Sequence, residues 1–237
     1  MATLSPFRYP GAKNKLLPIL MLDIKPLVQD HDVFIDAFVG GGSVLLEVAS
    51  QFPTAKLYAN DSDYWVYSFW RVVSGEDSIE FEELLDMVAQ KPTLDLFYAL
   101  RSETYQDHVR CAYKAIFFNR TTFSGIFRSG PIGGRNQTSR YTVDCRYNPK
   151  ALRSKIINCR NILNGRLEIS NQNYADYAPL TSGNDPIYID PPYYLAGDSL
   201  YTSKMSDQDH FDLSILLYNR DNWVLSYDDC PEVRELY

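Results

Sequence analysis

The chain has 237 residues, of which 45% are hydrophobic and 22% charged, and this composition fits one globular core or a domain with a small insertion. No apolar run reaches the roughly 20 residues that a membrane-spanning helix needs, and the first residues lack the basic and apolar regions of a signal peptide. The four cysteines and three histidines have no zinc-site or disulfide spacing, so we expect a reduced, cytoplasmic protein without a bound metal.

The net charge of −7 conceals a strong polarity along the chain. Residues 108–167 carry twelve basic side chains and one acidic one, Asp144, for a balance of +11, while the remainder carries −18. Local field rather than net charge governs the binding of phosphate groups. The basic stretch, in which arginine outnumbers lysine, therefore predicts a surface for a polyanion. A solvated helix face followed by a polar loop is the alternative explanation.

The first elements in chain order are a helix and a strand that ends in glycines. We expect the helix over 12–28, with Pro18 as a kink or as a second start. An apolar strand then runs into the glycines at 40–42 and into a helical pattern over 43–51. Glycines at such a turn allow positive φ and let a ligand approach the main chain. A dinucleotide fingerprint would need a third glycine where this chain has Leu45, and an ordinary tight turn is the alternative.

The second strand and a run of helices come next. A strand at 56–60 ends at Asp61, where an acid on the second strand can bind ribose hydroxyls. An apolar helical pattern covers 62–73. Residues 78–119 predict further helices, interrupted at Pro92.

A long polar stretch, 120–147, follows these helices and is rich in Gly, Ser, Thr, Arg and Asn. Loops of this length in compact domains are usually functional. We therefore predict that 75–147 is an inserted target-recognition region, and that 1–74 and 148–237 together form the other domain. Candidates for contacts to phosphates and base edges are Arg128, Arg135, Asn136 and Arg140.

Strands and helices alternate again after this stretch. Such alternation predicts an α/β fold with a mainly parallel, doubly wound sheet, whose ligands bind at the carboxyl ends of the strands. The expected elements are a helix at 149–164, strands at 166–170 and 187–189, a helix at 207–218 and a strand at 223–227.

Asp190, Pro191, Pro192 and Tyr193 directly follow the strand at 187–189. A carboxylate and a carbonyl preset by proline can accept both hydrogens of an aromatic amine, while a tyrosine ring covers its face. A strand-end turn is the alternative for Asp190 alone. Together with the glycine turn upstream, the tetrapeptide predicts a site where an amino nitrogen meets a carbon electrophile.

Five ordered segments resemble those of the Dam family of DNA adenine-N6 methyltransferases, and the resemblance covers nearly the whole chain. It implies a Rossmann-like methyltransferase sheet with an inserted, mostly helical target-recognition domain. The segments are 7–13, the turn Phe38-x-Gly40-x-Gly42, the pair Asn60-Asp61, the run Asn119-Arg120-Thr121-x-Phe123-x-Gly125, and Asp190-Pro191-Pro192-Tyr193.

The resemblance implies transfer of a methyl group from S-adenosylmethionine to N6 of adenine at a specific sequence in double-stranded DNA. The target base would be flipped out of the duplex. Such enzymes serve restriction–modification systems, phages and mobile elements. The tetrapeptide from Asp190 to Tyr193 would be catalytic, and Asn119 and Arg120 would face the DNA. Implied contacts to S-adenosylmethionine come from Tyr9, Lys13, Asp36, Phe38, Gly40, Gly42, Asp61, Tyr174 and Asp190.

Individual roles follow for four of these residues. Lys13 can pair with the methionine carboxylate of the cofactor, Asp36 can attract its ammonium group, and Asp61 can bind its ribose diol. Tyr174 is expected against the adenine of the cofactor, although a core position is an equal alternative.

Two other functions stay open at this stage. One is methylation of nitrogen in RNA or protein, which related motifs also serve. The other is a catalytically silent DNA-binding relative. The family usually continues beyond the strand at 223–227 with a helix and two closing strands, so we expect a short C-terminus to leave a sheet edge unpaired.

Overall fold

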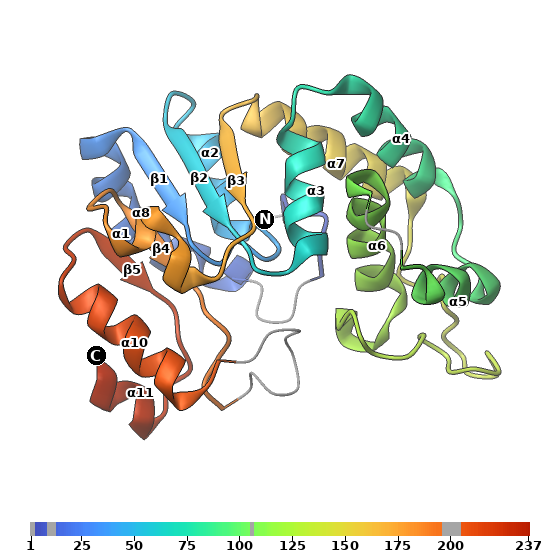
Figure 1. Ribbon diagram of the computed structural model, residues 1–237. Coiled ribbons are helices and arrows are strands. Elements are labelled where there is room, and N and C mark those ends of the chain that lie inside the picture. The colour runs from blue at the N-terminus through green and yellow to red at the C-terminus, as the bar shows by residue number, and fades with distance from the viewer. Residues whose placement is uncertain (1–2, 9–12, 105–106, 196–204) are drawn as a thin grey trace.

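A five-stranded, all-parallel sheet lies at the centre of the computed structural model, which describes residues 3–8, 13–104, 107–195 and 205–237 (Figure 1). The strand order is β3-β2-β1-β4-β5, so β1 is central. Because all neighbouring strands are parallel, their carboxyl ends meet at one edge, and the predicted α/β fold is confirmed. The strands are β1 (Val33–Asp36), β2 (Lys56–Asn60), β3 (Leu167–Ser170), β4 (Ile187–Ile189) and β5 (Trp223–Leu225).

The two strands that carry the main motifs, β1 and β4, lie side by side in the middle of the sheet. Ile35 is in register with Ile187, and Asp36 with Tyr188. All three residues of β4 are buried, as expected for a parallel strand that is covered on both faces. The short apolar runs in the sequence reflect this burial, because they show no alternation of polar and apolar residues.

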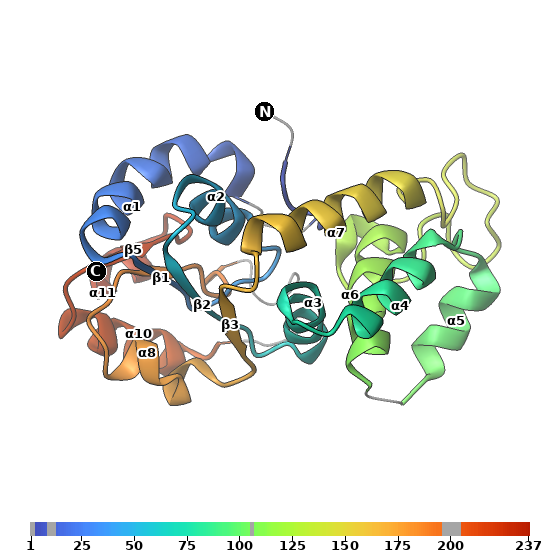
Figure 2. The same ribbon diagram turned by 90° about the horizontal axis from the view of Figure 1, so that it is seen from above.

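Helices cover both faces of the sheet (Figure 2). On one face lie α1 (Leu17–His31) and α2 (Ser43–Gln51), and on the other lie α8 (Ala178–Thr181) and α10 (Asp207–Tyr218). The chain ends in the short helix α11 (Pro231–Leu236).

The first helix begins later and ends later than predicted. A 3-10 turn, Lys13–Lys15, precedes it, and α1 then runs from Leu17 to His31 instead of over 12–28. Pro18 lies in the first turn of α1, where backbone N–H groups have no partner within the helix, so a proline costs no hydrogen bond there. This proline therefore marks the start of the helix and not a kink.

A helical lobe lies beside the sheet, with α3 (Tyr64–Ser74) between the two (Figure 2). The helix α7 (Pro149–Leu163) runs from the lobe back to the sheet, where it packs against α2. One continuous hydrophobic core extends from β1 through α3 into the lobe, so the region inserted in sequence shares its core with the sheet. The helices of the lobe are α4 (Ser78–Ala89), α5 (Leu94–Ser102) and α6 (His108–Thr121).

The polar stretch after α6 is ordered by hydrogen bonds within itself. A single antiparallel bridge joins Thr122 to Pro131. The Gln137 side chain donates to the carbonyl of Ile132 at 2.8 Å and accepts from the backbone N–H of Val143 at 2.7 Å. This region therefore presents its remaining polar side chains from a defined backbone, in agreement with the long loop that the sequence predicts.

Candidate active site

The glycine turn and the tetrapeptide lie at the same edge of the sheet, on neighbouring strands. The backbone N–H of Ala37, directly after β1, donates to the carbonyl of Tyr188 in β4 at 3.0 Å. Asp36 and Asp190 therefore occupy adjoining strand ends, and the negative charge of Asp190 raises the pKa of Asp36. Segments about 150 residues apart in sequence thus meet at one edge of the sheet.

The glycine turn is held from two sides. The N–H of Gly40 donates to Oδ2 of Asp61 at 2.8 Å, and the Nε1–H of Trp70 in α3 donates to the carbonyl of Gly40 at 2.9 Å. Gly42 has φ +65°, and a Cβ at this position would overlap the Trp70 ring. Glycine alone fits there, because Trp70 packs directly against this turn and φ is positive.

Asp36 is a buried carboxylate with unsatisfied hydrogen-bonding capacity. Its side chain is 2% exposed, and Oδ1 has no hydrogen-bond partner among the described residues. Burial, followed by the charge of Asp190, raises the pKa of Asp36 well above its ordinary value. A buried carboxylate of this kind is stabilised by a cation, so the site fits the ammonium group of a bound amino acid moiety.

Asp61 lies at the end of β2 and is already bonded to main chain. Besides the Gly40 contact, its Oδ1 accepts from the N–H of Asp63 at 2.9 Å. Burial and the charge of Asp63 raise the pKa of Asp61 to about 7. Each carboxylate oxygen has a second lone pair, which leaves acceptors for hydroxyl groups such as those of ribose.

Asp190 pairs with a lysine from the N-terminal segment. Nζ of Lys13 lies 2.6 Å from Oδ2 of Asp190, and the lysine side chain is 4% exposed. Oδ1 of Asp190 is buried without a hydrogen-bond partner among the described residues. Burial raises the pKa of Asp190 to about 6, although the positive charge of Lys13 opposes this rise. The structure thus shows Lys13 paired with the carboxylate of the tetrapeptide, and its predicted link to a methionine carboxylate stays a prediction.

In the rest of the tetrapeptide, Pro191 is buried, Pro192 is half-buried, and Tyr193 contacts an aromatic ring and a cation. The Tyr193 ring stacks on that of Tyr227 at a centroid distance of 6.2 Å, and Nζ of Lys13 lies 4.8 Å from the Tyr193 centroid.

The Asp228 carboxylate binds the backbone of the two residues that follow the tetrapeptide. It accepts the N–H of Tyr194 at 3.0 Å and that of Leu195 at 2.8 Å. The sequence analysis missed Asp228, which lies three residues beyond the end of β5.

Tyr174 lies beneath the glycine turn in contact with Phe38. Their ring centroids are 6.0 Å apart, and the hydroxyl of Tyr174 donates to the carbonyl of Asp209 at 3.0 Å. Tyr174 is buried and Phe38 half-buried, so Phe38 leaves more ring surface open to a ligand. Tyr9, the remaining predicted cofactor contact, lies outside the described residues.

The predicted DNA contacts fall into two groups. Asn119 is completely buried; its Oδ1 accepts from the N–H of Arg8 at 2.6 Å. Arg120 donates to the carbonyl of Pro6, and burial lowers the pKa of its guanidinium to about 10. Both residues thus hold the N-terminal segment in place. The exposed group consists of Arg128, Arg135, Asn136 and Arg140.

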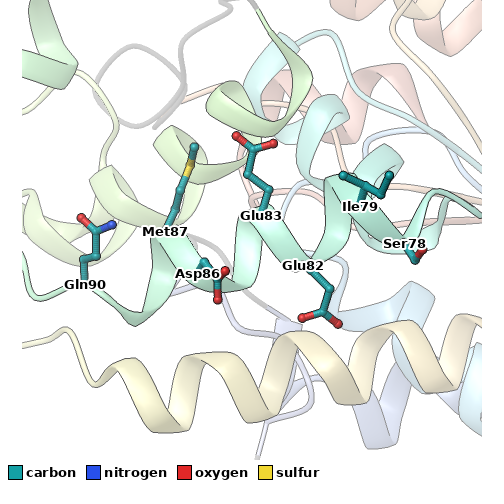
Figure 3. A pocket seen from close by; sticks show the side chains of 7 residues that line it. All are labelled: Ser78, Ile79, Glu82, Glu83, Asp86, Met87 and Gln90. Atoms are coloured by element: carbon teal, nitrogen blue, oxygen red, sulfur yellow. The ribbon is translucent and has the colours of Figure 1, made fainter.

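A hollow of about 480 Å³ along α4 lies away from the strand edge, within the lobe (Figure 3). Its carboxylates, Glu82, Glu83 and Asp86, project to opposite sides of the helix and do not converge on one point. Among the described residues no cluster of three or more His, Cys, Asp or Glu could hold a metal ion, and no described helix is long and apolar enough to cross a membrane.

A parallel sheet with a glycine turn after β1 and a carboxylate-proline-proline-tyrosine segment after β4 defines an amino-directed methyltransferase. The chain belongs to the D12 class N6 adenine-specific DNA methyltransferase family, whose model matches residues 9–237. It is similar to the Type II methyltransferase M.MjaIII of Methanocaldococcus jannaschii, with 25% identity over 202 residues, 78% of this chain and 68% of the relative. It is also similar to the Type II methyltransferase M1.LlaDCHI of Lactococcus lactis subsp. cremoris, with 25% identity over 214 residues, 84% of this chain and 70% of the relative.

Proposed function

We propose that this chain uses S-adenosylmethionine to methylate N6 of adenine in duplex DNA, with the target base flipped out of the helix. Membership of the adenine-specific family supports the reaction. The observation that carries the proposal is the pair of buried carboxylate oxygens, Oδ1 of Asp36 and Oδ1 of Asp190, that lack partners among the described residues. One suits the ammonium group of the cofactor, and the other suits an amino hydrogen of adenine.

The cofactor half of the site lies around the glycine turn. Asp36 would bind the ammonium group and Asp61 the ribose hydroxyls, while the main chain at Gly40 and Gly42 and the ring of Phe38 would line the cofactor. When bound, S-adenosylmethionine supplies an electrophilic methyl group. The negative field of Asp36 and Asp190 attracts its positive charge to this edge of the sheet.

The base half of the site lies around the tetrapeptide. The lone pair of the adenine amino group is delocalised into the ring, so the nitrogen is a weak nucleophile. Oδ1 of Asp190 would accept one amino hydrogen and the carbonyl of Pro191 the other, which favours a pyramidal nitrogen and stabilises the positive charge that develops on it. Lys13 holds Oδ2 and so orients the carboxylate. Tyr193 would stack on the face of the flipped base.

The exposed arginines of the lobe would bind the DNA backbone and its base edges. Arg128, Arg135, Asn136 and Arg140 are exposed on an internally hydrogen-bonded loop, and this loop lies within the strongly basic stretch 108–167. Basic side chains of this kind supply affinity through phosphate contacts and specificity through the major groove.

Methyl-labelled S-adenosylmethionine and plasmid DNA test this proposal directly. We expect label in DNA as N6-methyladenine, identified by mass spectrometry after nuclease digestion, and sequencing of the product would map the methylated sites. Asp190→Ala should abolish transfer, while Asp176→Ala, a change at an exposed aspartate, should leave it intact. Label confined to RNA or protein, or retention of DNA without any label, would refute the proposal.

A further inference from the structure

Arg101 is a half-buried cation in α5 that is held between aromatic rings. Its Cζ lies 4.1 Å from the ring centroid of Phe118 and 5.1 Å from that of Phe97. Burial lowers the pKa of its guanidinium, which nevertheless remains charged at neutral pH. No carboxylate in the described part of the chain forms an ion pair with it.

The hydrogen bonds of Arg101 go to the main chain of the basic loop. Nη1 donates to the carbonyl of Phe127 at 2.6 Å, and Nη2 donates to the carbonyl of Ser129 at 3.0 Å. The residue between these two acceptors is Arg128, whose side chain is exposed. One rigid, planar side chain therefore binds the carbonyls of the two residues that flank a predicted DNA contact.

The loop around Arg128 is closed independently at its base. The N–H of Ile132 donates to the carbonyl of Thr121 at 2.8 Å, and the N–H of Ser129 donates to the carbonyl of Ile126 at 2.9 Å. The Phe127 ring is buried, and its centroid lies 5.7 Å from that of the Trp65 ring. These contacts hold the turn at its base. Arg101 in addition holds the carbonyls of Phe127 and Ser129.

We propose that Arg101 is a positioning residue for target recognition, because it presets the direction in which Arg128 leaves the loop. The inference rests on the proposed function and adds to it a residue that never touches DNA. An arginine that is ordered before binding loses less conformational freedom on contact with a base edge, so the correct sequence is favoured more strongly. Loss of Arg101 should therefore weaken binding to the recognised sequence more than binding to other DNA.

A double-mutant cycle between Arg101 and Arg128 tests this coupling. The measured quantity is the ratio of dissociation constants for a duplex without the methylated sequence and for one of equal length that carries it. Arg128→Ala should lower this ratio by between about 5-fold and 150-fold, the range for one bidentate base contact. Arg101→Met should lower it about 5-fold or more alone, and less than about 2-fold when Arg128 is already alanine.

Two further variants separate geometry from charge and from stability. Arg101→Lys keeps the charge but replaces the rigid planar fork with a single flexible ammonium, so we expect it to lower the ratio as Arg101→Met does. Arg153→Met removes a lobe arginine that donates to the carbonyl of Leu85 in α4, and it should leave the ratio unchanged. Binding of S-adenosylmethionine and the thermal unfolding midpoint report folding, and Arg101→Lys carries the test if Arg101→Met does not fold.

The outcomes distinguish this inference from the proposed function. An equal effect of Arg101→Met with and without Arg128, or no effect of Arg128→Ala on the ratio, would overturn the positioning role and leave methylation intact. Failure of the unmodified chain to methylate or bind any duplex would instead overturn the proposed function.

Discussion

Replacement of Lys13 by methionine should move the pH dependence of methyl transfer toward higher pH. Lys13 lies 2.6 Å from Asp190, whose pKa is about 6 with this positive charge in place. A neighbouring opposite charge lowers a carboxyl pKa by roughly 1 to 3 pH units, so its removal should raise the pKa of Asp190 to between about 7 and 9. Methionine keeps a long apolar stem in the buried position and removes the ammonium group, with its charge and its hydrogen bond to Asp190.

The expected loss of rate follows from the ionised fraction of Asp190, because only the ionised carboxylate accepts well from the amino group. At a pH of about 6.5 this fraction would fall from roughly three quarters to about 3% if the pKa moved to about 8, which is a loss of about 25-fold. Above a pH of about 9 the two rates should converge.

Single-turnover methylation rates between pH 5 and pH 10 would measure this displacement, because they report transfer without product release. Lys15→Met, a change at an exposed lysine of the same turn, is the matched control and should keep the original profile. A profile of Lys13→Met that still rises near a pH of about 6, together with weaker binding of S-adenosylmethionine, would refute the ion-pair role. That result would instead support a contact between Lys13 and the methionine carboxylate.

Three further predictions concern the turn, the buried acid and the basic residues. Gly42→Ala should destabilise the protein by about 2–5 kcal/mol in urea unfolding, because the added Cβ meets an indole ring and φ is positive. The control is Gly134→Ala, where φ is +72° and nothing lies within 4 Å of the added Cβ. This change should cost only about 1–2 kcal/mol. Burial raises the pKa of Asp36 in the folded protein above its value in the unfolded chain. The folded state is therefore destabilised relative to the unfolded state as pH rises. Asp36→Asn should therefore raise the melting temperature at pH 8 and reduce the additional rise caused by S-adenosylmethionine; an undiminished rise would contradict the ammonium site. Arg135→Ala should reduce the salt dependence of DNA binding by about one unit of slope, whereas Arg120→Met should lower stability and leave that slope unchanged. Equal slopes for both variants would contradict the division of the predicted DNA contacts into a buried and an exposed group.

Local sequence patterns located most of the secondary structure. The predicted strands at 56–60 and 187–189 match β2 and β4, because short apolar runs bounded by polar residues have few other uses in an alternating chain. The prediction failed at the first helix, which was expected over 12–28. Pro18 and the preceding 3-10 turn begin α1 at Leu17.

The candidate site was predicted in part for the same reason. Asp36 and Asp190 each follow an apolar strand, and parallel strands bring their carboxyl ends together, so topology alone placed both at one edge. The sequence could not separate Asn119, which is buried at the end of α6, from Arg128, which is exposed, because residue type alone does not show burial.

Sequence by itself therefore determined the fold class, the parallel sheet and the candidate acids at the strand ends, since these follow from periodicity and from residues at strand ends. Only the tertiary structure decided the partners of the charged side chains. Lys13 and Asp190 are 177 positions apart, and Arg101 reaches the loop that carries Arg128 from another helix. Such pairings depend on how the elements pack in three dimensions, so they cannot be predicted from the spacing of residues along the sequence.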